Sequence, residues 1–180
     1  MIKQWRLDTQ NQSLVMSSIG NRLPCVIYWG DSLPSHESSD EMFEASKKDW
    51  GDNLIDLVPE LSILPEQSAN FAGQLGCKIR DLSGQLLSPS FVFSADKASN
   101  NSVTLIYTDK DLGLTYTATI DALIEDDVFA LGAKIESIDP IIMEWLSAPV
   151  IEVSLLSDEM VDYGGHWGGE FRKQTTPWVT

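Results

Sequence analysis

The chain has 180 residues, of which 43% are apolar and 22% are charged, a composition that suits one globular domain and not a disordered segment. Lys and Arg number 12 against 27 Asp and Glu, so the formal net charge is −15. This charge argues against binding to nucleic acid or to an anionic membrane surface, because both need clustered cations. A neutral substrate is compatible with it.

The N-terminal segment carries Lys3, Arg6 and Asp8 and has no apolar core, so it is not a signal peptide. No apolar run approaches the ~20 residues that span a bilayer. The two cysteines, Cys25 and Cys77, both stand beside apolar residues, and we expect two buried thiols and no disulfide framework. These features together lead us to expect a cytoplasmic protein of bacterial type.

Alternation of apolar and polar residues with a period of two is the dominant pattern. It is clearest over 103–108 and 114–121, which are joined by an Asp- and Gly-bearing hairpin loop at 109–113. In the second run we expect four side chains to face the core, namely Leu114, Tyr116, Ala118 and Ile120. The same pattern predicts strands over 2–8, 12–19, 23–29, 89–94, 102–108, 113–121, 127–138, 141–146, 150–156 and 166–174.

Helix signals are few. The best covers 49–58, which ends before Pro59, and the acidic stretch 31–50 is predicted to be a long surface loop. Many short strands punctuated by Gly, Pro, Asn and Asp predict an all-β, antiparallel β-sandwich with few short helices, forming a single domain over 1–180. The apolar pair Trp178-Val179 near the last residue leads us to expect that this domain belongs to a longer multidomain protein.

Metal and cofactor sites are not predicted. The only histidines are His36 and His166, and no Cys or His residues stand at zinc-ligand spacing. The segment 109–113 has its glycine in the fifth position where a calcium loop needs it in the sixth. The glycines of 164–169 lack the Lys-Ser/Thr of a phosphate loop and are interpreted as turn residues.

Nucleophilic and carboxylate catalysis find no clear support. No serine stands in a G-x-S-x-G turn, and Cys25 lies in an apolar strand where its thiol is inert. A glycosidase needs two carboxylates about 5–9.5 Å apart. Acidic residues are plentiful, but the sequence singles out no buried pair, and 125–127 is most simply a solvated β-turn. We therefore predict no catalytic residue in this chain.

The tryptophans are more suggestive, because an indole ring offers an apolar face on which a sugar ring stacks. For Trp5 and Trp145 we expect a place in the core, since both lie in apolar strands. Trp29 ends a strand and precedes the long polar stretch, so it is the candidate for ligand contact. A place in the core remains the alternative for Trp29 as well.

Several motifs together resemble the N-terminal region of bacterial family 36 α-galactosidases over nearly the whole chain. They are Tyr28-Trp29-Gly30, the segments 62–66 and 70–73, Asp109 with Gly113-Leu114, and the segment 166–171. The resemblance implies a β-supersandwich that precedes a (β/α)₈ barrel. It also implies a retaining enzyme whose two catalytic aspartates lie on the barrel beyond Thr180, so this chain alone is expected to be inactive.

The resemblance further implies that the supersandwich packs on the barrel of the same polypeptide, builds a homo-oligomer and borders the α-galactoside pocket. Some members carry Asp-Phe-Arg in the loop where this chain has Asn70-Phe71-Ala72, so an acceptor is kept while the Arg is absent. The candidate substrate-binding residues are therefore Trp29, Asn70 and Phe71. The alternative is a free-standing carbohydrate-binding or protein-interaction sandwich, which the tryptophans and acidic surface also permit.

Overall fold

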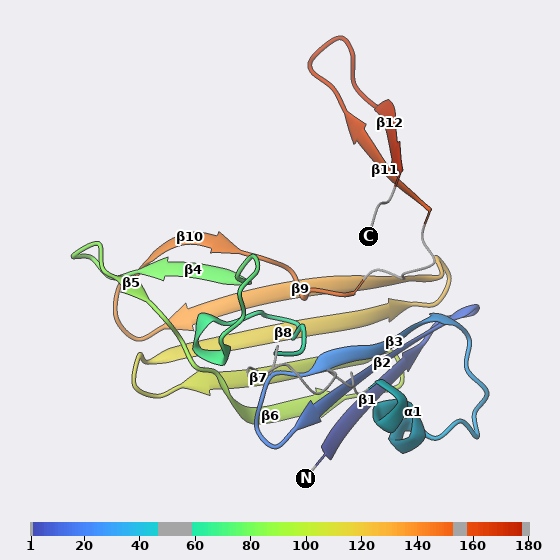
Figure 1. The fold of residues 1–180 in the computed structure, drawn as a ribbon, viewed down its shortest axis with the longest axis horizontal. Helices are drawn as coiled ribbons and strands as arrows, with labels where there is room; N and C mark the ends of the chain where they lie inside the picture. The colour runs from blue at the N-terminus through green and yellow to red at the C-terminus, as the bar shows by residue number, and fades with distance from the viewer. Residues whose placement is uncertain (1, 47–58, 153–157, 178–180) are drawn as a thin grey trace, which may run out of the picture.

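A computed structural model describes residues 2–46, 59–152 and 158–177 (Figure 1). Its helical elements are short, α1 (Ser39–Ser46) and the 3₁₀ helix η1 (Gln67–Ala69). Its strands are β1 (Ile2–Asp8), β2 (Gln12–Ile19), β3 (Cys25–Asp31), β4 (Cys77–Arg80), β5 (Leu86–Leu87), β6 (Val92–Ala98), β7 (Ser102–Asp109), β8 (Leu114–Leu123), β9 (Val128–Ser137), β10 (Ile142–Leu146), β11 (Glu159–Gly164) and β12 (Arg172–Pro177).

The regular alternation of β7 and β8 builds the centre of a four-stranded antiparallel sheet in the order β6-β7-β8-β9. Every second side chain of β8 is buried, and these include the four that the sequence predicts: Leu114, Tyr116, Ala118 and Ile120. Their partners on β7 are buried too, since the register places Tyr107 opposite Tyr116. One face of this sheet is therefore the floor of the core.

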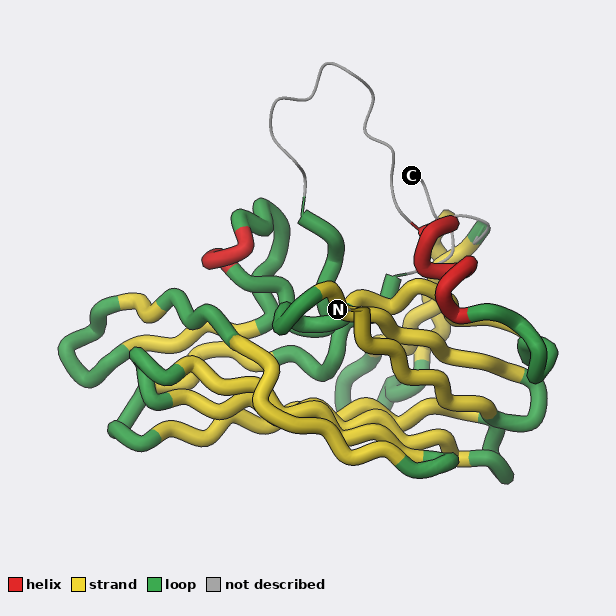
Figure 2. The backbone as a smooth tube through the Cα atoms, turned by 90° about the horizontal axis from the view of Figure 1, so that it is seen from below, coloured by secondary structure: helices red, strands yellow, loops and turns green. Residues whose placement is uncertain are grey.

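The sheet β1-β2-β3 lies over that floor, so the two layers face one another in Figure 2. It contributes Trp5, Leu7, Leu14 and Met16 to the same cluster of buried side chains as β7 and β8. Trp5 is 6% exposed, and its indole N–H donates to Asp96 Oδ2 at 3.0 Å. The prediction of an all-β, antiparallel sandwich is confirmed, and so is the core position of Trp5.

Two smaller sheets complete the described fold. The order β10-β4-β5 makes one, and β4 contributes the buried Cys77 and Ile79 to the core. The hairpin β11–β12 makes the other, and Figure 1 shows it standing away from the sandwich. Trp167 and Phe171, in the turn of this hairpin, are 94% and 85% exposed. The hairpin thus presents large apolar side chains that the described sandwich does not cover.

Several predicted boundaries are wrong. The strand expected at 23–29 runs two residues later. Of the strand expected at 166–174, only 172–174 belong to β12, and residues 165–171 form the turn between β11 and β12. Gly165 and Gly168 adopt positive φ there, which glycine accepts at little cost. Residues 150–152 of the strand expected at 150–156 form no strand; Val150 instead donates its backbone N–H to the Ile63 carbonyl.

The predicted loop at 31–50 contains α1. Ser38 caps this helix, because its Oγ accepts the backbone N–H of Glu41, and the buried Phe43 anchors it to the protein. The helix predicted at 49–58 lies outside the described residues. The short strands β4 and β5 were not predicted, since strands of four and two residues carry too little alternation to be recognised.

Trp145 is not a core residue, because 48% of it is exposed. A bulge between Met143 and Trp145 shifts the register of β10, and Trp145 then pairs with the exposed Lys78 on the outer face of the sheet. The expectation of two buried thiols is confirmed for Cys77 only, since Cys25 is half-buried. Cys25 and Cys77 are not joined in a disulfide.

Candidate functional site

Trp29 lies near the C-terminal end of β3, the edge strand of its sheet, and 49% of it is exposed. Its register partner is Leu14 of β2. Its indole N–H donates to Gln12 Oε1 at 3.0 Å. The ring is therefore held in one orientation while much of its surface stays in contact with solvent, which is the state expected of a ligand-contacting tryptophan.

Gln12 owes its position to a clamp between two turns of the chain. Its side-chain Nε2 donates to the backbone carbonyl of Asp127 at 2.6 Å, while its Oε1 accepts from Trp29. Asp127 adopts a left-handed conformation with φ 57° between β8 and β9. The amide of Gln12 thus connects the indole to the turn of the opposite sheet.

The carboxylate of Asp127 completes this clamp by binding the turn between β1 and β2. It accepts the Thr9 hydroxyl at 2.6 Å, the Asn11 backbone N–H at 3.0 Å and the Asn11 side-chain amide at 3.0 Å. These hydrogen bonds, with that of the Thr9 hydroxyl foremost, lower the pKa of Asp127 to about 2. The interpretation of 125–127 as a turn is correct, but Asp127 is bound to the protein and not merely solvated.

A groove of about 290 Å³ opens beside the indole of Trp29. Its lining comes from the edge strands of both sheets, β3 and β9, with one residue from β2 and one from the segment after β10: Gln12, Trp29, Val128, Phe129, Leu131 and Ile151. The groove is therefore the mouth of the sandwich on this side. Its walls are apolar apart from the amide of Gln12, so they suit a ligand with an apolar face.

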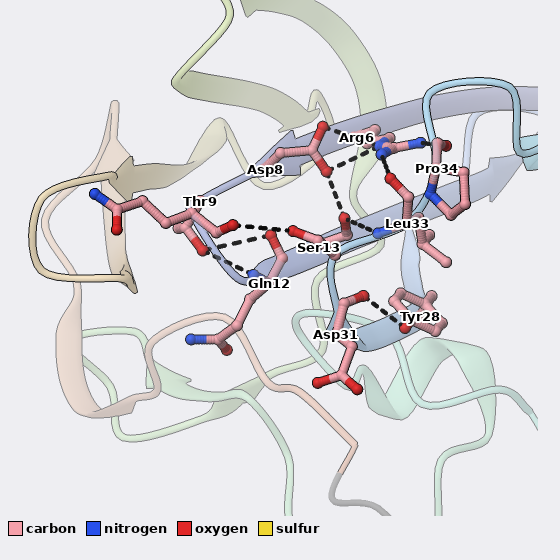
Figure 3. A network of polar contacts seen from close by, with 11 residues as sticks. Arg6, Asp8, Thr9, Gln12, Ser13, Tyr28, Asp31, Leu33 and Pro34 are labelled. Carbon is pink, nitrogen blue, oxygen red and sulfur yellow. Dashed lines mark hydrogen bonds and ion pairs between the residues drawn. The ribbon is translucent and has the colours of Figure 1, made fainter.

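A second group of hydrogen bonds fixes the chain where it leaves β3 (Figure 3). The Arg6 guanidinium donates to the carbonyls of Leu33 and Pro34 at 2.6 and 3.1 Å, and its Nε pairs with Asp8 at 2.9 Å. The Leu33 backbone N–H donates to Ser13 Oγ at 2.9 Å. The end of β3 is thus anchored on β1 and β2.

Asn70 and Phe71 lie elsewhere. They follow η1 in the loop before β4, where Asn70 adopts a left-handed conformation with φ 60° and is exposed, and Phe71 is half-buried. Neither lines the groove beside Trp29. The structure does not gather the three candidate residues into one site: Trp29 belongs to the mouth between β3 and β9, and the pair belongs to the loop.

Two carboxylates that the sequence did not bring together as a pair stand near this loop, the half-buried Glu66 and the buried Asp109. Glu66 Oε1 accepts the Phe91 backbone N–H at 2.7 Å, and Asp109 Oδ2 accepts the Ser90 backbone N–H at 2.8 Å. Burial, opposed by the Phe91 hydrogen bond and assisted by the charge of Asp109, raises the pKa of Glu66 to about 7. The two carboxylates bind the backbone N–H groups of adjacent residues, one each, and so hold in place the segment that enters β6.

Asp109 also accepts the backbone N–H groups of Asp111 and Leu112 through Oδ1, at 3.0 and 2.9 Å. This is a turn stabilised by an aspartate side chain, as the hairpin interpretation of 109–113 predicts. Among residues 2–46, 59–152 and 158–177, no three His, Cys, Asp or Glu side chains gather in a way that could hold a metal ion. No helix in those ranges is long and apolar enough to span a membrane.

Solved structures of α-galactosidases resemble this chain in fold. The α-galactosidase from Lactobacillus brevis aligns with 98% of the chain at a TM-score of 0.71 and 14% identity. A substituted form of the GH36 α-galactosidase AgaA from Geobacillus stearothermophilus, in complex with raffinose, aligns with 99% at 0.77 and 14% identity. The GH36 α-galactosidase AgaB from the same organism aligns with 99% of the chain at a TM-score of 0.73 and 15% identity.

The chain shares the fold of part of these enzymes. It spans only 27–28% of their length. No family model and no curated protein sequence matches the chain. The resemblance to α-galactosidases noted from the motifs is thus confirmed in three dimensions, and it extends over nearly the whole chain.

Proposed function

We propose that the chain is the non-catalytic, N-terminal β-sandwich of a family 36 α-galactosidase, an enzyme that hydrolyses terminal α-galactosides. The observation that carries the proposal is the fold match, which covers 98–99% of this chain but only 27–28% of each enzyme. The rest of such an enzyme would contain the barrel with its catalytic aspartates. Two cysteines outside any disulfide also suit the cytoplasm of a bacterium, where we place the parent enzyme.

The sandwich would pack on the barrel of the same polypeptide and contribute to a homo-oligomer. The hairpin β11–β12 supports this role, because Tyr163, Trp167 and Phe171 are exposed apolar side chains suited to a partner surface. Trp29 on one side, and the loop with Asn70 and Phe71 on the other, would frame the entrance of the sugar pocket. Asn70 and its neighbour Gln67 are exposed and so available to a sugar hydroxyl.

Hydrolysis of a chromogenic α-galactoside tests the absence of catalysis in this chain. The purified 180-residue protein should release no chromophore above the rate in buffer. Turnover that co-purifies with the chain and persists after further purification would overturn the proposal.

As a test of the parent enzyme, the reading frame beyond codon 180 should continue with alternating strand and helix patterns; a stop codon there would contradict membership of a longer enzyme.

The second candidate function is a free-standing carbohydrate-binding sandwich, and the groove beside Trp29 is the observation that favours it. The two candidates differ in what surrounds the chain and not in its fold. A stop codon after codon 180, together with saccharide binding by the purified chain, would favour this second candidate.

A further inference from the structure

We propose that the groove between the edge strands β3 and β9 binds a neutral saccharide, with one sugar ring stacked on Trp29. This inference rests on the proposed function, since it names the ligand class of a residue that function assigns to the sugar pocket. The first argument is orientation. The indole is held by Gln12, which is held by Asp127, so stacking a ligand on it needs little further ordering of the side chain.

The shape and lining of the groove form the second argument. Phe129 and Leu131 stand on β9 opposite the buried Ala122 and Ile120, so they face the space between the sheets and form the wall across from Trp29. A volume of about 290 Å³ is at the small end of ligand pockets. It suits one or two rings and is too small for a helix of a protein partner.

Polar groups at the rim form the third argument. Gln12 and Asp31 are register partners on β2 and β3, and Trp29 is two residues before Asp31, so the three side chains share one face. Figure 3 shows the side chains of Gln12 and Asp31 pointing to the same side. Within the described part of the chain the Asp31 carboxylate accepts no hydrogen bond, while its backbone carbonyl accepts the Tyr28 hydroxyl at 2.8 Å.

An exposed carboxylate and an amide beside an aromatic face match the surface of a sugar. The hydroxyls of a saccharide donate to the carboxylate of Asp31, and its C–H face lies on the indole of Trp29. A net charge of −15 disfavours an anionic ligand. A neutral saccharide therefore fits both the lining and the charge of this side of the molecule.

Binding is tested with the ¹⁵N-labelled chain, whose six tryptophans each give one indole N–H signal. Galactose and raffinose are titrated, and p-cresol is titrated separately as a mimic of a tyrosine side chain from a protein partner. Trp29→Phe identifies the Trp29 signal. We expect both saccharides to shift that signal with millimolar affinity, while the signal of Trp145, which is equally exposed, stays in place.

Variants then locate the site. Trp29→Ala should weaken saccharide binding about tenfold or more, because the stacking interaction is lost. Asp31→Asn should weaken it less, and Trp145→Ala should leave it unchanged. Trp29→Phe keeps an aromatic ring and should retain part of the affinity, so it tests the stacking interaction even if the alanine variant does not fold. The backbone signals of each variant show whether it is folded.

A Trp29 signal that neither saccharide moves would overturn the proposal, as would equal weakening by Trp145→Ala. A signal that moves with p-cresol alone would also overturn it, in favour of an apolar side chain of a protein partner. None of these results would affect the role as a non-catalytic domain, which is tested by hydrolysis and by the reading frame.

Discussion

Glu66 and Asp109 are two neighbouring carboxylates of the kind that a glycosidase uses for catalysis, but in this chain they bind backbone N–H groups. Each accepts one of two adjacent backbone N–H groups, those of Phe91 and Ser90, at the entry to β6. The sequence places Glu66 next to Pro65 and Asp109 at the start of a hairpin loop, and it does not bring them together. Their proximity comes from the packing of the loop before β4 against β7.

The raised pKa of Glu66 makes stability depend on pH. The folded protein holds this proton up to about pH 7, whereas the unfolded chain releases it near 4.5, so the folded state binds more protons between these values. The contribution of Glu66 to the free energy of unfolding should therefore fall by up to about 3 kcal/mol as the pH rises from 4.5 to 7.

Denaturant unfolding of the wild-type chain and of Glu66→Gln across this range measures that contribution. The difference between the two proteins should change with pH in the stated direction, because the glutamine side chain does not titrate. Parallel curves for the two proteins would show that Glu66 titrates normally. Asp111→Asn, an exposed change in the hairpin loop, serves as the control and should leave the wild-type dependence intact.

Tyr116 offers a test of a different residue-scale effect. Its hydroxyl is buried in the core and has no hydrogen-bond partner within the described part of the chain. Because an unsatisfied buried polar group destabilises a protein by roughly 1–3 kcal/mol, Tyr116→Phe should raise the free energy of unfolding by about 1 kcal/mol. Calorimetric melting of the variant measures the change.

The matched control is Tyr28→Phe. The Tyr28 hydroxyl donates to the Asp31 carbonyl at 2.8 Å, so removing it should lower the free energy of unfolding by about 1 kcal/mol. Destabilisation of similar size in both variants would mean that the Tyr116 hydroxyl is satisfied in solution, for instance by a buried water.

At the scale of secondary-structure elements, the clamp formed by Asp127 ties the β1–β2 turn to the β8–β9 turn, and so ties the two sheets together at one end. Asp127→Gly removes the carboxylate and tolerates the positive φ, so it isolates the effect of the hydrogen bonds. We expect a lower melting temperature and faster hydrogen exchange at the Asn11 amide.

Asp126→Gly is the control for this change, because Asp126 is the exposed neighbour in the same turn. Its melting temperature and the exchange of the Asn11 amide should stay close to those of the wild type. Equal exchange rates at Asn11 in the two variants would contradict the clamp.

Elements with long alternation were predictable from the sequence, and short or irregular ones were not. β8 has ten residues that alternate strictly, and its inward-facing side chains were identified correctly. β5 has only two residues, and the strand predicted over 166–174 overlaps the turn of the β11–β12 hairpin, although its glycines were correctly interpreted as turn residues. The alternation of apolar and polar residues predicts a strand only where it continues over enough residues to outweigh the effects of tertiary packing.

Only one residue of the candidate site, Trp29, could be predicted from the sequence. Trp29 stood out because it ends an apolar strand, but Gln12 and Asp127 are 17 and 98 positions away from it in the chain and carry no motif. They meet because the sandwich brings the β1–β2 and β8–β9 turns together. Pairings of that kind depend on topology, which the spacing of residues along the chain does not reveal.

For the molecule as a whole, the charge of −15 is a source of self-repulsion. Ion pairs among the described residues join Asp8 with Arg6, Glu144 with Lys78 and Arg80, and Glu136 with Lys134. Salt shortens the Debye length from about 30 Å at 0.01 M to about 10 Å at 0.1 M. The melting temperature should therefore rise with salt over this range.

Scanning calorimetry in NaCl and in choline chloride measures this effect. General screening predicts the same rise with both salts at equal ionic strength. A rise with NaCl alone would point to bound sodium ions, and a fall with both salts would mean that attraction within ion pairs outweighs the repulsion.

The projecting hairpin β11–β12 has a consequence for proteolysis. Arg172 and Lys173 lie on its second strand and are exposed, whereas Arg6 is half-buried and bonded to two backbone carbonyls. Trypsin should therefore cut the isolated chain after Arg172 and after Lys173, because the hairpin projects from the sandwich, whereas the exposed Lys97 and Lys134 stand in strands of the four-stranded sheet. If the proposed barrel or a second copy of the chain covers the hairpin, those two bonds should resist the protease, so their cleavage reports whether the hairpin is covered.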